Sequence, residues 1–459
     1  MEIKTINPAT EAVLQTYLTL QPLQANTLIE AGHITYQAWK KTDFSQRKQR
    51  MLKLAELLRK NQDKYALLSA QEMGKPITAG RAELEKSAWV CEHFAEHAES
   101  YLAPRLIKTD MKKMIVGYQP LGIIFAIMPW NFPFWQVFRF AAPTIMAGNA
   151  AILKHAPITS GSGNAIAELF LEAGFPDHLF QHFVLDNEGA AAVIAHEKIA
   201  AVTLTGSERA GSSVAANAGK HIKKAVLELG GNDPYVILAD ADLDRAARCV
   251  VASRLNNSGQ VCIAAKRTIA VREVVDELTK KIIAEAQLYQ MGDPLDSATK
   301  FGPLARQDLR DSLHQQVSES ISKGATLISG GQIPNRKGYY YPVTILTNVC
   351  PGMPAFDEEL FGPVISIITA NDEAHAIRLA NQSHYGLGAA VFTQDLARGE
   401  QIAMHEIETG TCFVNAFVAS DPRVPFGGIK QSGFGRELSQ EGILEFVNVK
   451  TVGISENSI

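Results

Sequence analysis

From Met114 onward, short apolar runs alternate with stretches in which apolar residues recur at helical spacing. The runs predict strands at Leu121–Met128, Ala150–Lys154, Ala200–Thr205, Lys223–Leu229 and Tyr235–Leu238. Between them the pattern predicts helices at 136–147, 160–173, 188–196 and 207–219. Because apolar strands that alternate with helices are buried on both faces, we expect a parallel sheet covered by helices on both sides, which is the α/β fold class.

A second series of the same kind follows Cys262. Its predicted strands are Arg267–Val271, Ala325–Ser329, Val364–Ile368, Gly388–Thr393 and Thr411–Val414. We therefore expect two α/β domains, joined near Glu228–Asp233, where adjacent glycines suit a crossover. The segment Asp110–Gly122 and the tail after Gly442 fit neither domain, so we expect both to pair with something else, such as another subunit.

Residues 24–104 differ from the rest and are expected to be helical. In the stretch Ser45–Gln71, leucines and a tyrosine recur at helical spacing with lysines and arginines between them. This pattern is typical of ordinary amphipathic packing and indicates no functional site.

Composition narrows the class of protein. The chain has 459 residues, of which 46% are hydrophobic and 20% are charged, so it is long enough for two or three domains with an ample core. A net charge of -4 and a pI of about 6.3 do not indicate the basic surface typical of proteins that bind nucleic acid or anionic membranes. The longest apolar run, Leu121 to Trp130, is too short to span a membrane.

Cysteine and histidine usage bears on compartment and metal binding. The 5 cysteines are few, odd in number and scattered, which is typical of a reducing cytoplasm rather than of a disulfide framework. The 12 histidines form no HExxH motif or His/Cys cluster, so we expect no catalytic metal. The first residues contain no apolar segment typical of a signal peptide, and we expect a cytoplasmic protein.

Two positions carry candidate chemistry. Cys262 ends the run Gly259-Gln260-Val261-Cys262 in a segment of small residues, where its thiolate could act as a nucleophile. The alternative for a lone cysteine is a small buried hydrophobe. Glu228 ends an apolar run and precedes two glycines, which suggests a carboxylate at the lip of a cleft that could deprotonate a thiol or a water. The alternative is a strand-end carboxylate in solvent.

Three further places suggest ligand binding, each with a plainer alternative. Gly206 and Ser207 lie between a predicted strand and a predicted helix, where free backbone N–H groups suit a phosphate, although Ser207 alone could be an N-cap and no GxGxxG fingerprint is present. Lys154 ends a predicted strand, where ligands bind in open α/β sheets, or it is a solvated terminal lysine. Asn131, within Pro129–Pro133, could donate its amide to an oxyanion or occupy a turn.

These positions belong to motifs that follow one another in a fixed order. They are Pro129–Pro133, Lys154, Thr205-Gly206-Ser207, Glu228-Leu229-Gly230-Gly231, Gly259–Cys262, Glu359–Pro363, Pro425–Gly428 and Lys430–Glu437. Together they resemble the aldehyde dehydrogenase superfamily over nearly the whole chain, in its bacterial succinate-semialdehyde dehydrogenase branch. The resemblance implies an aldehyde dehydrogenase-like fold with two Rossmann-like open-sheet domains plus a small oligomerisation segment.

The resemblance also implies a division of the chain. Residues 1–106 and 122–228 would form a dinucleotide-binding domain, and residues 229–430 would form a catalytic domain. Residues 107–121 and 431–459 would be oligomerisation segments of a homo-oligomer, either a dimer or a tetramer.

The mechanism implied by the resemblance is covalent. Cys262 would form a thiohemiacetal with a small aldehyde, Asn131 and the Cys262 backbone N–H would hold the oxyanion, and Glu228 would activate the water that hydrolyses the later thioester. The residues implied to bind NADP or NAD are Trp130, Lys154, Pro157, Gly206, Ser207, Leu229, Glu359 and Phe361. Because Pro157 stands where many NAD-preferring relatives carry a glutamate, repulsion of a 2′-phosphate is missing and NADP use is expected.

The predicted helix that follows Asn131 carries candidate residues for substrate binding. Arg139 lies about two helical turns further on, near Trp135, and could grip a carboxylate bidentately, with Ser420 adding a hydroxyl. The alternative is an arginine paired to an internal acid. We therefore expect oxidation of succinic semialdehyde to succinate. The open alternatives are another small aldehyde, either glutaric semialdehyde or a neutral aliphatic one, and a non-catalytic structural protein similar to the crystallins.

Overall fold

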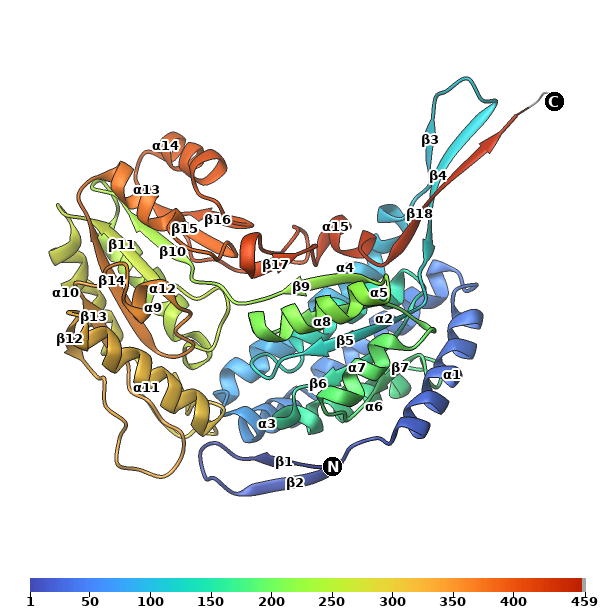
Figure 1. The fold of residues 1–459 in the computed structure, drawn as a ribbon, viewed down its shortest axis with the longest axis horizontal. Coiled ribbons are helices and arrows are strands. Elements are labelled where there is room, and N and C mark those ends of the chain that lie inside the picture. The colour runs from blue at the N-terminus through green and yellow to red at the C-terminus, as the bar shows by residue number, and fades with distance from the viewer. Residues whose placement is uncertain (456–459) are drawn as a thin grey trace.

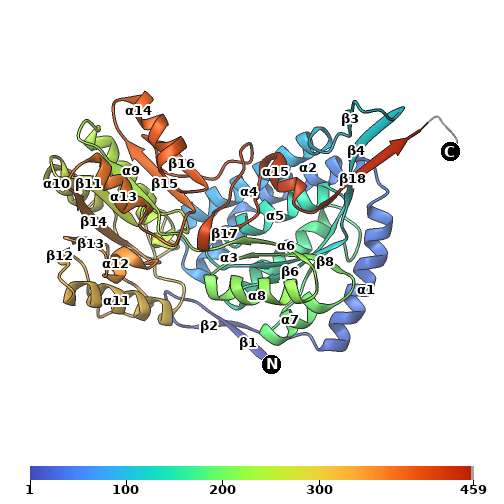
Figure 2. The ribbon, with the colours of Figure 1, turned by 45° about the horizontal axis from the view of Figure 1, so that its top comes forward.

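The structure, a computed structural model, describes residues 1–455, and within that range the strands form four sheets. The two larger sheets are the cores of two lobes, and a narrow arm projects from the lobe that carries the N-terminus (Figure 1). The turned view shows the same two lobes side by side with the arm at one end (Figure 2). The expected α/β class with two open sheets is confirmed.

The first lobe is built on a six-stranded sheet in the order β17-β9-β8-β5-β6-β7. Its strands are β5 (Ile123–Met128), β6 (Ala150–His155), β7 (Phe180–His182), β8 (Ile199–Thr205), β9 (Lys224–Glu228) and β17 (Gly433–Phe434). The strands from β9 to β7 run parallel, and the short β17 pairs antiparallel with β9. Strand β5 and the first four residues of β6 are apolar, and both strands are almost wholly buried, as expected for central strands covered on both faces.

Four helices precede this sheet along the chain: α1 (Pro22–Trp39), α2 (Phe44–Lys60), α3 (Gln62–Met73) and α4 (Ile77–Tyr101). The expected helical region 24–104 is divided because Asp43 caps the start of α2 and Gly74, with a φ of 77°, ends α3. The helices between the strands are α5 (Trp135–Met146), α6 (Ser160–Glu172), α7 (Asn187–Ala195) and α8 (Glu208–Lys220). Helices α7 and α8 pack against β8 and β9, while α5 packs against β5 and β6 with α2 and α4 beyond it.

The second lobe is built on a seven-stranded sheet in the order β12-β13-β14-β11-β10-β15-β16. Its strands are β10 (Pro234–Ile237), β11 (Arg267–Val271), β12 (Thr326–Ser329), β13 (Thr344–Thr347), β14 (Val364–Ala370), β15 (Gly388–Phe392) and β16 (Thr411–Val414). Its helices are α9 (Leu243–Leu255), α10 (Val275–Ala286), α11 (Gln307–Ser322), α12 (Pro354–Asp357), α13 (Glu373–Asn381) and α14 (Leu396–Gln401). Within this sheet only β12 and β13 pair antiparallel.

The two segments that fitted neither expected domain pair with each other. β4 (Lys113–Pro120) pairs antiparallel with β18 (Val447–Ile454) along its whole length, and β3 (Arg105–Ile107) lies on the other edge of β4. These three strands form the projecting arm, and α15 (Ser439–Leu444) leads into it. Residues 456–459 of the expected oligomerisation tail lie outside the described residues.

The apolar runs predicted the central strands closely. β11 and β16 have the predicted bounds, and the other predicted strands differ by one or two residues at their ends. The hairpin of β1 (Glu2–Ile6) and β2 (Val13–Leu18) and the short strands β7, β13 and β17 were not predicted. The domain boundaries and the oligomerisation segments stay predictions. No helix among residues 1–455 combines the length and the apolar character needed to cross a membrane.

Candidate active site

The loop that leads to Cys262 has an unusual backbone. Helix α9 ends just before it, and Asn257, Ser258 and Gly259 follow with φ of 49°, 58° and 78°, all in the left-handed region. Non-glycine residues rarely adopt this conformation, so the surrounding contacts must hold the loop in place. A side chain at position 259 would collide with the backbone of Gly362, which explains the glycine. The loop therefore presents Cys262 at a well-defined position.

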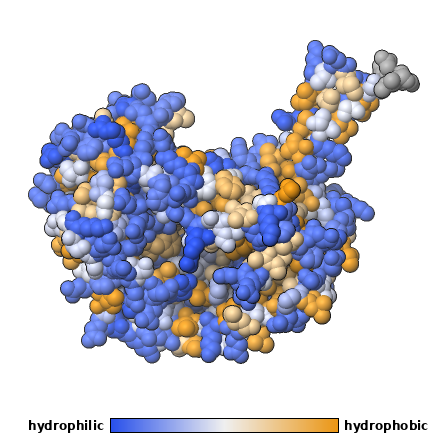
Figure 3. Space-filling model, viewed as in Figure 1, coloured by the Kyte–Doolittle hydropathy of each residue, from blue (hydrophilic) through white to orange (hydrophobic). Residues whose placement is uncertain are grey.

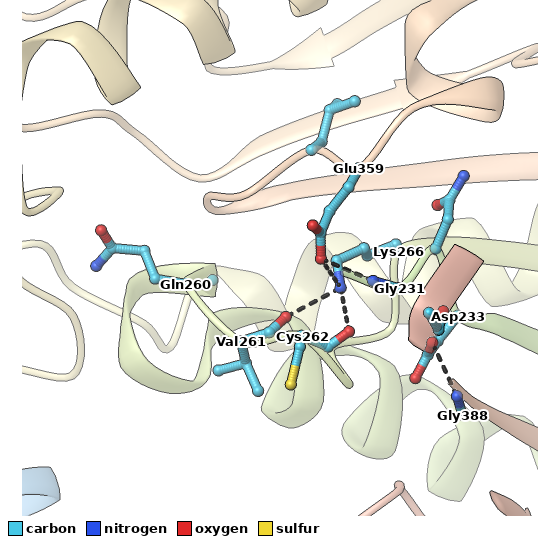
Figure 4. Close-up of polar contacts among 12 residues, drawn as sticks. Gly231, Asp233, Gln260, Val261, Cys262, Lys266, Glu359 and Gly388 are labelled. Atoms are coloured by element: carbon cyan, nitrogen blue, oxygen red, sulfur yellow. Dashed lines mark hydrogen bonds and ion pairs between the residues drawn. The ribbon is translucent and has the colours of Figure 1, made fainter. Parts of the chain in front are cut away.

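Lys266 braces this loop, as Figure 4 shows. Its Nζ donates to the carbonyl oxygen of Val261 at 3.0 Å and to that of Cys262, and it forms an ion pair with Glu359 at 3.0 Å. Glu359 also accepts a hydrogen bond from the backbone N–H of Gly231 at 3.1 Å. This buried ammonium therefore links the chain after β9 to the Cys262 loop.

The Cys262 thiol is half-buried. Burial raises the pKa of this thiol to about 12, and the cations of Lys266 and Arg139 oppose the rise. A thiol with so high a pKa is protonated near neutral pH, so nucleophilic attack requires that its proton be removed. The two cations are the groups that make this removal easier.

Asn131 lies next to the same loop. It follows β5, is buried, and its Nδ2 donates to the carbonyl oxygen of Gln260 at 2.9 Å. Asn257 Nδ2 donates to the backbone carbonyl oxygen of Asn131 at 2.7 Å. Asn131 and Cys262 line one cavity, so the structure places the expected amide donor near the expected nucleophile.

Glu228 ends β9, and its carboxylate is turned into the protein. The residue is only 2% exposed, and within residues 1–455 neither carboxylate oxygen has a hydrogen-bond partner. Burial raises the pKa of Glu228 well above its ordinary value, and the nearby carboxylate of Glu437 raises it further. A buried carboxyl group without a partner is uncommon, and one that serves as a base must turn towards its water or thiol.

Three neighbouring cavities share lining residues. The first, of about 500 Å³, shares Ser207 with the second, of about 240 Å³. The second shares Gln136 and Cys262 with the third, of about 250 Å³. Cys262 therefore stands where the second and third cavities meet, while Glu228 is absent from the described lining of both.

The first cavity lies between the end of β6 and the start of α8. Its lining includes Lys154, Ser207 and Arg209, and no acidic residue among the described ones. Lys154 is buried at the strand end, which lowers its pKa. Ser207 caps α8, its Oγ accepting from the Ala210 N–H at 3.4 Å, so the positive end of the helix dipole lies at this cavity. Pro157 is exposed just beyond β6 and places no carboxylate there.

The second cavity gathers the other residues expected to bind the cofactor. They are Trp130, Gly206, Ser207, Leu229, Glu359 and Phe361. The rings of Trp130 and Phe361 meet edge to face with centroids 5.8 Å apart. A side chain at Gly230 would collide with the Glu359 carboxylate, so the glycine allows that carboxylate to lie at the cavity.

The third cavity gathers all three residues expected to bind the substrate, Trp135, Arg139 and Ser420. The Arg139 guanidinium, however, forms an ion pair with Glu437 and lies 4.8 Å from the centre of the Phe426 ring. This is the pairing to an internal acid that the sequence left open as the alternative. A role of Arg139 in substrate binding stays a prediction.

The sequence reasoning missed four charged residues of the site: Lys86, Arg209, Lys266 and Glu437. Each lies on a different segment, and only the fold brings them to the cavities or to Cys262 and Glu228. A signal was present for Lys266, which lies four residues after Cys262, but none distinguished Lys86, the one lysine of α4, from an ordinary solvated charge.

Comparisons with known proteins agree with this geometry. The sequence profile described as Aldehyde dehydrogenase family matches residues 1–452. The chain is 46% identical to the probable succinate-semialdehyde dehydrogenase (NADP(+)) of Synechocystis sp., over 99% of this chain and 100% of that protein. It is 44% identical to the succinate semialdehyde dehydrogenase (NAD(P)+) Sad of Escherichia coli, over 98% of this chain and 97% of that protein. The solved structure of succinic semialdehyde dehydrogenase from Streptococcus pyogenes in complex with NADP+ matches with a TM-score of 0.97 and 36% identity, covering 99% of this chain and 100% of that one.

Proposed function

We propose that this chain, which belongs to the aldehyde dehydrogenase family, oxidises succinic semialdehyde to succinate with NADP+ or NAD+. The observation that carries the proposal is the place of Cys262, which lines both the cavity of the expected cofactor residues and the cavity of the expected substrate residues. A nucleophile at such a junction can hold the substrate covalently in a fixed position beside the cofactor. The names of the relatives support the same substrate.

The proposed steps use Cys262 and Asn131, which line the second cavity, and Glu228, which must turn towards it. The Cys262 thiolate adds to the aldehyde carbon, and the oxygen that becomes negative accepts hydrogen bonds from Asn131 and the Cys262 backbone N–H. A bound nicotinamide supplies the acceptor for the hydride that leaves this carbon, and the adduct becomes a thioester. Glu228 then takes a proton from a water as its oxygen attacks the thioester carbon, which breaks the C–S bond and releases succinate.

The residues of the first two cavities fit a dinucleotide. The two cations of the first cavity, whose described lining contains no acid, suit a ribose with or without a 2′-phosphate, and the N-terminus of α8 suits a pyrophosphate. The Glu359 carboxylate in the second cavity suits the hydroxyls of the other ribose. We therefore infer use of NADP as well as NAD.

Arg209 provides the test of this cofactor inference. It is exposed, and it has no ion pair among the described residues. We expect Arg209→Ala to weaken NADPH binding by about tenfold, as for loss of one charge-assisted hydrogen bond, and to leave NADH binding unchanged. Quenching of protein fluorescence gives both dissociation constants, and Arg272→Ala, in the second lobe, is the control. Equal weakening of both cofactors would contradict a contact with the 2′-phosphate.

Steady-state kinetics test the proposed function. Reduction of NADP+ and NAD+ is measured with succinic semialdehyde, glutaric semialdehyde and propanal. We expect kcat/KM for succinic semialdehyde to exceed both others by about tenfold, or about 1.4 kcal/mol. Equal or faster turnover of propanal would rule out succinic semialdehyde as the preferred substrate, but the assignment to the aldehyde dehydrogenase family would stand. Absence of turnover with every aldehyde, together with an inert Cys262 thiol, would favour the structural protein.

We also propose a homo-oligomer, a dimer or a tetramer, assembled through 107–121 and 431–459. The arm exposes apolar side chains, visible in Figure 3, and among the described residues its edge strands β3 and β18 pair only with β4. The exposed apolar residues are Leu106, Ile107, Met111, Val449, Val452 and Ile454.

We also propose the division of the chain into a dinucleotide-binding and a catalytic domain. We further propose a cytoplasmic location, which the five free cysteines support.

A charge on the arm tests this assembly. We expect Val452→Asp to shift the sedimentation coefficient from that of the oligomer towards that of a smaller species, because an unpaired carboxylate in an apolar interface is costly. The control is Leu288→Asp, at an exposed apolar position of the second lobe. An unchanged sedimentation profile for the arm variant would place the interface elsewhere.

A further inference from the structure

Lys86 lines the third cavity, and the proposed chemical steps give this cation no role. It lies half-buried on α4, and its Nζ donates to Ser420 Oγ at 2.8 Å and lies 4.3 Å from the centre of the Trp135 ring. Within residues 1–455, no carboxylate forms an ion pair with it. Its direct partners are thus a neutral hydroxyl and an aromatic face.

The other charged side chains that line this cavity have internal partners. Glu83 forms an ion pair with Lys75 and accepts from two backbone N–H groups at the start of α5, at 2.8 Å and 2.9 Å. Arg139 is paired with Glu437. The cavity therefore presents one positive charge that is not matched by a contacting acid, that of Lys86.

Ser420 adds a hydrogen-bond donor beside this charge. Its Oγ accepts from Lys86, and in the described part of the chain its hydroxyl proton has no acceptor. The adjacent Asp421 is held by Arg423 at 2.5 Å and lies outside ion-pair distance of Lys86. An ammonium and a hydroxyl that point into one cavity suit a carboxylate, whose two oxygens accept both hydrogen bonds.

We propose that Lys86, together with Ser420, binds the carboxylate of the substrate and determines the preference for ω-carboxy aldehydes over neutral ones. Lys86 and Cys262 line the same cavity of about 250 Å³, so a small aldehyde can reach both. This inference rests on the proposed function in one respect, that the substrate has a carboxylate at the end opposite its aldehyde.

Arg139 is less suited to this task. To bind the substrate it would have to leave Glu437, whose carboxylate would then lie buried and unpaired beside that of Glu228. Removing one partner of a buried ion pair is strongly unfavourable, because the remaining charge is uncompensated. Lys86 gains a charged partner without losing one.

The titration of Lys86 supports the geometry. Burial, with the Arg139 guanidinium on α5 as a second cause, lowers the pKa of Lys86 to about 8, although the carboxylates of Asp421 and Glu83 oppose the fall. Since kcat/KM reports the free enzyme, the preference for a carboxylate aldehyde should fall as the pH rises through about 8 and the ammonium loses its proton. Dividing kcat/KM for succinic semialdehyde by that for butanal removes titrations, such as that of Cys262, that affect both substrates.

The decisive experiment compares kcat/KM for succinic semialdehyde, glutaric semialdehyde and butanal. We expect Lys86→Met to lower the values for both carboxylate aldehydes by about ten- to a hundredfold, mainly through KM, and to leave butanal within about twofold. Lys86→Arg should retain most of the preference and move the pH dependence of the ratio to higher pH. Arg139→Met should instead lower the turnover of all three aldehydes, because it leaves Glu437 unpaired.

Other outcomes separate this inference from the proposed function. Equal loss for all three aldehydes, or no loss, in Lys86→Met would overturn the assignment of Lys86. If the wild type does not prefer succinic semialdehyde to butanal, the proposed function fails, and calorimetric titration with succinate then decides about Lys86. Weaker succinate binding by Lys86→Met than by the surface control Lys53→Met supports the carboxylate site, and equal binding overturns it.

Discussion

Replacing Cys262 by alanine is expected to lower aldehyde oxidation on the order of 10⁴- to 10⁶-fold while leaving cofactor binding intact. The nucleophile forms the bond on which both later steps depend, so its loss removes the covalent route rather than slowing one step of it. Cys262 stands at the junction of two cavities, and no other cysteine lines either of them among the described residues. The measurement is steady-state NADP+ reduction, with NADPH binding followed by fluorescence.

Cys412 offers a matched control for this substitution. It lies on β16, it is half-buried, and burial raises its pKa to about 12, as for Cys262. Cys412→Ala should therefore change activity by less than about twofold, because loss of its buried sulfur atom affects the stability of the protein more than the chemistry at Cys262. Activity of Cys262→Ala within tenfold of the wild type would contradict the covalent mechanism and reopen the case for a structural protein.

The fold was predictable where a single local pattern decides the structure. The central strands β5, β6 and β8 are largely apolar runs, each followed by a helix, and their pattern predicted them closely. The hairpin of β1 and β2 was not predictable in this way, because most of its side chains are exposed and no alternation of apolar residues marks it. For the arm, the sequence showed only that its two segments fit neither domain. Their pairing was not predictable, because the partner of β4 lies more than three hundred residues away, in β18.

The site was predictable where chemistry coincides with a motif. Cys262, Asn131 and Glu359 sit in such motifs, and the structure places their side chains at one cavity. Charge pairing was not predictable, because Arg139 and Glu437 meet only through the packing of α5 against the chain near β17. The same applies to Lys86, because its contact with Ser420 joins residues far apart in sequence.

A second large effect is expected for Glu228→Gln, which should stall the enzyme as a thioester on Cys262. The amide cannot accept a proton from water, so deacylation should slow on the order of 10²- to 10⁴-fold. Acylation should persist, because the groups that lower the Cys262 pKa are Lys266 and Arg139 rather than Glu228. We therefore expect a burst of about one NADPH per active site, followed by slow turnover, and a succinyl adduct of Cys262 in the mass spectrum.

The pH dependence of the deacylation rate gives an independent test of Glu228 as the base. Burial and the Glu437 carboxylate raise the Glu228 pKa, and hydrolysis needs the carboxylate, so the deacylation rate should rise with pH as Glu228 loses its proton. Glu437→Gln removes the second cause and leaves Arg139 free to stabilise the charge, so it should move this rise to lower pH. Glu72→Gln, which changes a buried carboxyl group that accepts from Gly161 and Ser162 and lines neither cavity at Cys262, should give neither burst nor adduct. If Glu228→Gln also gives neither, Glu228 acts before hydride transfer, as the base that deprotonates Cys262.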